Sequence, residues 1–138
     1  RGNHHKIAIG KYVNIQDNCV IHSDAPAIFG DYVTLGHHVI CHATTVEEYC
    51  LLGNGAVVNG DAIIRNHSVV AAGSVVLERA EFPPNSFIVG APAGVKSQTS
   101  ERHIKMIEGV ANGYHKVGQL FKSDGLEDAD RNDFNSEV

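Results

Sequence analysis

A six-residue repeat constrains the fold of this chain more strongly than any other feature of its sequence. From residue 46 onward a large aliphatic residue recurs at every sixth position, and a small residue stands four places after each one. The aliphatic residues are Val46, Leu52, Val58, Ile64, Val70 and Val76, and the small ones are Cys50, Ala56, Ala62, Ser68, Ser74 and Ala80. The same phase is present earlier, at Ile9, Ile15, Ile21, Phe29 and Leu35. This period matches neither an α-helix nor alternation along one strand.

A period of six is typical of a coil of short strands with a turn after each strand. Three such segments make one triangular turn of about 18 residues, with the large aliphatic residue inside and the small one at the tight corner. Successive coils stack at the ordinary spacing between strands, so backbone hydrogen bonds run from coil to coil. We therefore predict an all-β solenoid, the left-handed parallel β-helix of hexapeptide repeats. A β-sandwich predicts alternation by two and a different strand spacing, which this sequence does not show.

The repeat stops after Ala80, and a different organisation follows. Residues 87–95 predict a last strand and an exit turn, and Thr99 or Ser100 is suited to cap a helix. A stripe of apolar residues at helical spacing comes next: Ile104, Ile107, Ala111, Tyr114, Val117 and Phe121. We divide the chain into a β-helix domain over residues 1–96, a C-terminal α-helix over residues 97–122, and an acidic tail over residues 123–138 that we expect to be flexible.

Charge and cysteine usage narrow the function classes. The chain of 138 residues has a formal net charge of −5, and its last 16 residues, with six acids and one arginine, account for all of it. The neutral remainder offers no basic patch for nucleic acid or anionic membranes, and no apolar run is long enough to span a membrane. Three cysteines without a C-x-x-C pair argue against a disulfide framework and a cysteine-rich zinc site. We predict a protein of the cytoplasm or the mitochondrial matrix, not a secreted one.

The repeat is irregular in two places, and both contain histidines. The first irregularity adds two residues just after His22, where we expect an outward loop, and the second removes one residue around His42. Irregularities in a regular solenoid are expected at functional sites. His22 and His42 are 20 residues apart, so removing the insertion leaves 18, or one full coil. They should stack on adjacent coils, within reach of one metal ion.

His37 should lie apart from this pair, because it precedes His42 by five residues and belongs to the preceding side of the triangle. Within one chain the three histidines cannot meet. In a trimer of parallel solenoids, His37 of one chain can meet His22 and His42 of the next. Three imidazole ligands leave the fourth position of Zn²⁺ for water, which is the pattern of a catalytic site.

The segments "NIQDNCVIH" and "GHHVICH" resemble the gamma-class carbonic anhydrase family. The resemblance runs from Arg1 to about Lys96, and its diagnostic part is a histidine after "VI" followed by "GHxxxxH", present here as His22, His37 and His42. It implies reversible hydration of CO₂ to bicarbonate by a trimer of this chain or of homologous chains. Each interfacial metal ion then has two ligands from one chain and one from its neighbour.

The same resemblance implies roles for the "NIQD" segment. The amides of Asn14 and Gln16 would orient the metal-bound hydroxide and the substrate, and Asp17 would pair across the interface with Arg1. Zn²⁺ is the expected metal, and imidazole ligands also accept Fe²⁺ or Co²⁺. Asp24, in the loop beside His22, is a candidate proton relay, although a solvated turn residue is the commoner role for such an aspartate.

Two other function classes stay open. A hexapeptide acyltransferase would use one histidine as general base on a coenzyme A substrate, but it gives no reason for the coil match between His22 and His42. A non-catalytic assembly subunit is the other class, because gamma-type carbonic anhydrase trimers also resemble parts of mitochondrial respiratory complex I. A thiol–imidazole pair of Cys41 and His42 is disfavoured, because neighbours on a strand point to opposite faces.

Overall fold

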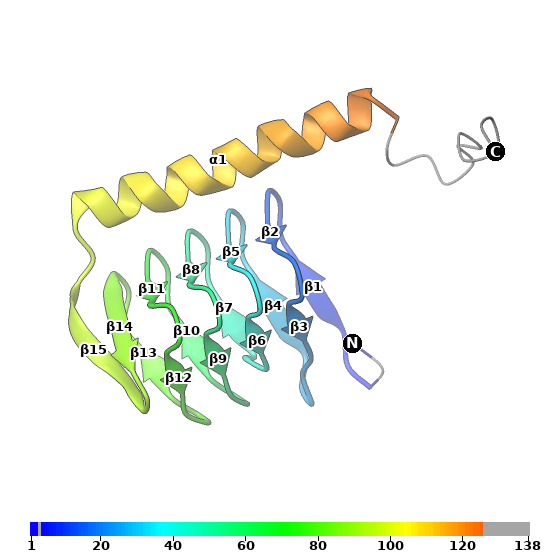
Figure 1. Cartoon of the computed structure of the whole chain (residues 1–138). Coiled ribbons are helices and arrows are strands. Elements are labelled where there is room, and N and C mark those ends of the chain that lie inside the picture. Colours follow the sequence, from blue (N-terminus) through cyan, green and yellow to red (C-terminus); the bar gives the residue numbers. More distant parts are fainter. Residues whose placement is uncertain (3, 126–138) are drawn as a thin grey trace.

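The six-residue repeat folds into short parallel strands, which wind into a triangular solenoid followed by one helix (Figure 1). The structure is a computed structural model that describes residues 1–2 and 4–125. Sheet A contains β1 (Ile7–Ile9), β4 (Ala27–Phe29), β7 (Thr45–Val46), β10 (Ile63–Ile64) and β13 (Glu81–Phe82). Sheet B contains β2 (Asn14–Ile15), β5 (Thr34–Leu35), β8 (Leu51–Leu52), β11 (Val69–Val70), β14 (Ser86–Gly90) and β15 (Ala93–Gln98). Sheet C contains β3 (Val20–Ile21), β6 (Ile40–Cys41), β9 (Val57–Val58) and β12 (Val75–Val76).

The core is a set of inward rows that the repeat predicts. Leu35, Leu52 and Val70 align across β5, β8 and β11, and each is fully buried. The first coil differs, because its strands β1 and β2 pair with a neighbour on one side only. Ile9 and Ile15 occupy inward positions by register but remain 51% and 41% exposed. The prediction of a hexapeptide β-helix followed by one helix is confirmed.

The corners of the solenoid have an unusual backbone conformation. The residue before each small one has a positive φ, and among the described residues nine that are not glycine do so, with φ between 53° and 61°. These are Tyr12, Asn18, Tyr32, His38, Tyr49, Asp61, His67, Arg79 and Asn85. Residues other than glycine rarely adopt this left-handed backbone conformation, which costs about 1 kcal/mol or more per residue. It is kept at these corners because hydrogen bonds to the preceding coil fix the backbone, as from His38 N–H to the Asp17 carbonyl at 3.0 Å.

Helix α1 (Glu101–Ser123) returns along the solenoid, from the last coil toward the first, over the side that holds sheet B (Figure 1). Ile107 and Ala111 are its fully buried residues. The ring of His103 stacks on Phe87 with centroids 4.8 Å apart, and His115 meets Tyr12 edge-on at 4.4 Å. These contacts attach the first turn of the helix to the last coil and its C-terminal half to the first coil. No helix in the described part of the chain is long and apolar enough to cross a membrane.

The C-terminal boundaries differ in detail from those expected. Residues 93–98 form strand β15, antiparallel to β14, where the sequence suggested only an exit turn. The expected boundary at residue 96 therefore falls inside β15, and the helix begins after Ser100, one of the two residues suited to cap it. The acidic tail expected over residues 123–138 lies outside the described residues from position 126 onward.

Candidate metal centre

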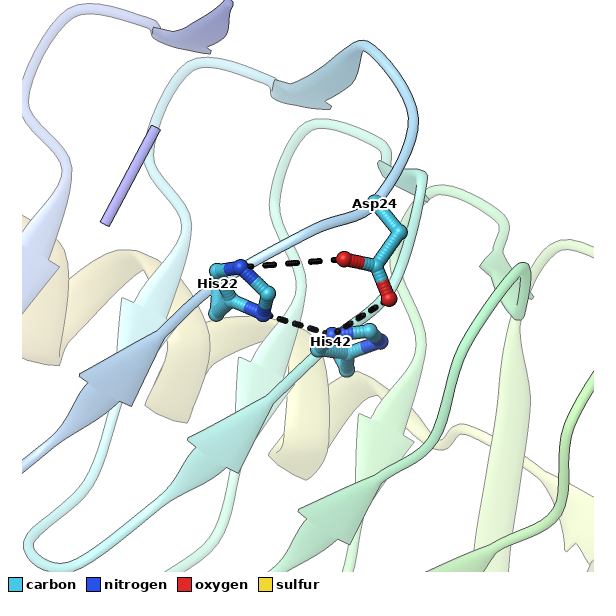
Figure 2. Close-up of side chains that lie close together, drawn as sticks. All are labelled: His22, Asp24 and His42. Carbon is cyan, nitrogen blue, oxygen red and sulfur yellow. Dashed lines mark hydrogen bonds and ion pairs between the residues drawn. The ribbon is translucent and has the colours of Figure 1, made fainter. Parts of the chain in front are cut away.

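Two histidines meet where strands of sheet C end. His22 follows β3 and His42 follows β6, and these strands pair in parallel with Ile21 opposite Cys41. The backbone N–H of each histidine donates to the next coil, to the carbonyls of Cys41 and Val58. Nδ1 of His22 lies 2.8 Å from Nε2 of His42, and the ring centroids are 4.8 Å apart (Figure 2). The two residues therefore lie side by side on adjacent coils, at the separation of one coil that their sequence spacing implies, with their ring planes tilted by 47°.

Asp24 is the third member of this cluster (Figure 2). Its carboxylate oxygens lie 3.8 Å from Nε2 of His22 and 3.6 Å from Nε2 of His42. The loop after His22 does not simply bulge outward as expected. Ser23 is buried, and its Oγ accepts the N–H of Ala25 at 3.3 Å, so the side chain between them points back over the histidines. The only feature of the sequence that pointed to Asp24 was the two-residue insertion directly after His22.

The surroundings of His22 favour its neutral imidazole, the form that binds metal ions. Burial lowers the pKa of His22, and the Arg1 guanidinium lowers it further, against a smaller raising effect of Asp24. Nη2 of Arg1 lies 3.2 Å from Nε2 of His22. A guanidinium only donates, so Nε2 accepts and the ring hydrogen sits on Nδ1, which donates to His42. Two imidazoles and a carboxylate form a donor set that Zn²⁺, Fe²⁺ and Co²⁺ all accept.

His37 lies at the other end of β6, at the corner where sheet B meets sheet C. Its Nδ1 lies 3.1 Å from Oδ2 of Asp17, and its backbone N–H donates to Oδ1 of Asn54 at 3.0 Å. His37 therefore lies outside the cluster of His22, Asp24 and His42. Within one chain, then, His37 lies apart from His22 and His42, on the other side of β6.

The four residues of the "NIQD" and N-terminal segments lie in different places. Arg1 contacts His22, and Asp17 contacts His37. Gln16 is half-buried, and its backbone N–H donates to the Leu35 carbonyl at 3.0 Å. Asn14 instead lines a groove of about 570 Å³ beneath α1, where its Nδ2 is buried without a hydrogen-bond partner in the described structure. The structure therefore does not bring Asn14 to the histidine cluster.

Cys41 is not a nucleophile of this site. The residue is buried in the core, whereas His42 beside it faces outward. Burial raises the pKa of the Cys41 thiol to about 11, so it remains protonated at neutral pH. Cys50 is equally buried, and burial raises its thiol pKa to about 12. Both cysteines serve as small packing residues of the solenoid.

Fold and site together define a hexapeptide-repeat β-solenoid with a cluster of potential metal ligands at one corner. A protein of Methanocaldococcus jannaschii named "Probable carbonic anhydrase" is 38% identical over 125 residues, covering 89% of this chain and 79% of the relative. Gamma carbonic anhydrase 2, mitochondrial, of Arabidopsis thaliana is 31% identical over 132 residues, covering 90% of this chain. The chain spans about half of that plant protein, 48% of its length. No protein-family model matches the chain.

The chain belongs to the gamma-class carbonic anhydrase family. This membership implies a metal cofactor, for which the described residues offer the cluster of His22, Asp24 and His42. Among solved structures, a hexapeptide transferase family protein from Anaplasma phagocytophilum superposes with a TM-score of 0.82 at 30% identity. The superposition covers 88% of this chain and 72% of that protein. The hexapeptide fold is thus shared with proteins named for another chemistry.

Proposed function

We propose that this chain catalyses the reversible hydration of CO₂ to bicarbonate, as a trimer that binds a divalent metal ion at each interface. His22 and His42 of one chain and His37 of the next would hold the metal. The juxtaposition of His22 and His42, 2.8 Å apart at one end of β6 while His37 stands at the other end, is the observation that carries the proposal. A zinc ion held by imidazoles lowers the pKa of its water to about 7 and so supplies hydroxide at neutral pH.

The outer face of sheet C is the surface that we assign to the interface. It lies between the two histidine sites, and its outward row includes Val20 and Ile40, which are 54% and 48% exposed. Exposed apolar rows of this kind mark interaction surfaces. Three copies arranged around a three-fold axis with this face inward would bring the His37 end of one chain to the His42 end of the next. The apolar face of sheet C, the His22 and His42 end and the His37 end are thus all compatible with one three-fold axis.

Asp17 prepares His37 for such a role. With Oδ2 of Asp17 at 3.1 Å, Nδ1 of His37 carries the ring hydrogen and donates it, which leaves Nε2 free to bind a metal ion. A carboxylate behind a ligating imidazole also fixes the orientation of the ring. The predicted roles of Gln16 and Asn14 in orienting the substrate, and of an Arg1–Asp17 pair across the interface, stay predictions.

Metal analysis combined with CO₂-hydration kinetics tests the proposal. We expect one metal ion per chain in the purified trimer and measurable turnover. The His37→Ala variant should lose turnover, whereas His38→Asn, a change at the neighbouring corner residue whose φ of 58° asparagine tolerates, should keep it. A metal-free monomer would rule out the interfacial site. Bound metal without turnover would refute the enzymatic proposal and favour an assembly subunit, such as one of respiratory complex I.

A hexapeptide acyltransferase is the second candidate, supported by the structural neighbour at 30% identity. This candidate predicts release of free coenzyme A from acetyl-coenzyme A in the presence of an amine or alcohol acceptor, without a metal requirement. Turnover that survives chelation and depends on one histidine alone would favour it. The choice between cytoplasm and mitochondrial matrix stays a prediction.

A further inference from the structure

We infer that Asp24 is a metal ligand, so that His22, Asp24 and His42 form a three-ligand site for a divalent cation within a single chain. The inference rests on the proposed metal centre and extends it. In this arrangement His37 of a neighbouring chain adds a fourth ligand to a site that already has three. The chain would then bind its metal before it assembles.

The geometry places one ligand atom of each residue within reach of a common ion. These three atoms lie within 4.8 Å of one another, and Figure 2 shows the carboxylate turned toward both rings. Ligands at about 2.0–2.1 Å from a metal ion are roughly 2.8–3.0 Å apart in octahedral geometry and roughly 3.3–3.4 Å apart in tetrahedral geometry. Nε2 of His42 lies 2.8 Å from Nδ1 of His22 and 3.6 Å from Oδ2 of Asp24, so the first separation is at the lower end of that range and the second is just above it. A metal ion bound through Nδ1 of His22 would displace the ring hydrogen there and replace the hydrogen bond between the rings.

The chemistry of the donor set favours particular ions. Two histidines and one carboxylate on one face of the metal, with open positions opposite, is an arrangement that binds Fe²⁺. The Asp24 side chain is 76% exposed, so its negative charge has not been desolvated and remains available to the cation. Compared with three neutral imidazoles, this set offers one formal charge to offset that of the ion.

The loop and its surroundings support this role for Asp24. The hydrogen bond from Ala25 N–H to buried Ser23 Oγ holds the turn on which Asp24 stands. Beside the cluster lies a cavity of about 190 Å³, whose lining includes His42 and Asp24 together with Asp61, Glu78 and Arg79. Three carboxylates against one guanidinium make this depression negative, which attracts a cation and offers it an access path.

Cobalt binding tests the inference independently of turnover. Co²⁺ is titrated into metal-free protein while its visible absorption is followed, and the number of bound ions is checked by metal analysis. The variants are His37→Ala, the double variant His37→Ala with Asp24→Asn, and a control that combines His37→Ala with Glu101→Gln. Glu101 is 93% exposed in the first turn of α1, so its neutralisation removes the same charge far from the cluster.

We expect His37→Ala to bind one Co²⁺ per chain, and we expect adding Asp24→Asn to weaken that binding at least about tenfold, as loss of ligand support does elsewhere. The Glu101→Gln control should bind as His37→Ala does. Equal affinity of His37→Ala with and without Asp24→Asn would overturn the inference, and so would a His37→Ala protein that binds no Co²⁺. If Asp24→Asn slows CO₂ hydration but leaves Co²⁺ affinity unchanged, Asp24 acts as a proton acceptor and not as a ligand. That result would also overturn the inference. If Asp24→Asn weakens Co²⁺ binding as expected and the wild-type protein does not hydrate CO₂, the inference holds and the proposed function is refuted.

Discussion

Replacing Ile40 by aspartate should separate the subunits of the proposed trimer. Ile40 lies in β6 between His37 and His42, on the outward row of sheet C, and it is 48% exposed in the single chain. If sheet C forms the interface, this exposed half becomes buried on assembly. A charge at that position would have to be buried without a partner. We therefore expect the Ile40→Asp variant to be monomeric and to lose the ligand that His37 supplies.

The size of this effect follows from the exposed fraction. Full burial of an isoleucine side chain contributes about 1.5–3 kcal/mol, so burying the remaining half contributes about 0.7–1.4 kcal/mol per chain. An aspartate loses this contribution and adds several kcal/mol for desolvating an unpaired carboxylate. With three copies in the assembly, the loss is on the order of 10 kcal/mol per trimer. Each 1.4 kcal/mol changes an association constant by about tenfold, so the trimer should not persist at micromolar concentration.

Light scattering coupled to size-exclusion chromatography measures the assembly directly. Ile28→Asp is the matched control, because Ile28 also lies in the outward row of a parallel sheet, sheet A, and is 57% exposed. This control should remain a trimer. An Ile40→Asp variant that stays trimeric would show that sheet C is not the interface. Loss of the trimer in both variants would show that the charge acts on folding and not on this surface.

Two further predictions concern the solenoid itself. Cys41 should resist thiol reagents until the chain unfolds, because the residue is 1% exposed and burial raises its thiol pKa to about 11. The rate of thiol modification in a Cys19→Ser background measures this resistance. Rapid modification of the folded protein would contradict the prediction. Glu47→Gln should lower the free energy of unfolding by about 1 kcal/mol or less at neutral pH, because Oε1 of Glu47 accepts from Arg65 at 2.7 Å in a pair that is partly exposed. That hydrogen bond lowers the pKa of Glu47 in the folded state, so the stabilisation is present above the usual value of 4.5 and is lost as the pH falls below it. Urea unfolding of both proteins above and below that pH measures the difference, and a gap that stays constant with pH would contradict this cause.

Much of the fold could be predicted because the repeat encodes it directly. Each inward position carries a large aliphatic residue in a fixed phase, as at Leu52 and Val58, so the period alone defines the sides of the triangle. The exposure of Ile9 and Ile15 could not be predicted from phase, since it depends on having a neighbouring coil on one side only. Strand β15 was missed because most of its residues are exposed and no apolar alternation marks it.

The candidate site could be predicted only where sequence spacing, counted in whole coils, places two residues together. The spacing of His22 and His42 places them on adjacent coils, since one coil separates them once the insertion is removed. The position of Asp24 could not be derived in this way. The direction of a side chain in a two-residue insertion depends on how the loop turns, here through the buried hydroxyl of Ser23, and no period specifies that turn.

A solenoid restricts how three ligands can meet. Side chains one coil apart stack on the same side, as His22 and His42 do, whereas residues five positions apart lie on different sides of the triangle, as His37 and His42 do. A third ligand must therefore come from a second chain or from a loop that departs from the repeat. His37, oriented by Asp17 at the far end of β6, is the candidate for the first route. Asp24, on the insertion after His22, is the candidate for the second. Because the two routes differ in their dependence on assembly, metal binding by monomeric Ile40→Asp protein separates them: binding that persists comes from the loop, and binding that is lost comes from the neighbouring chain.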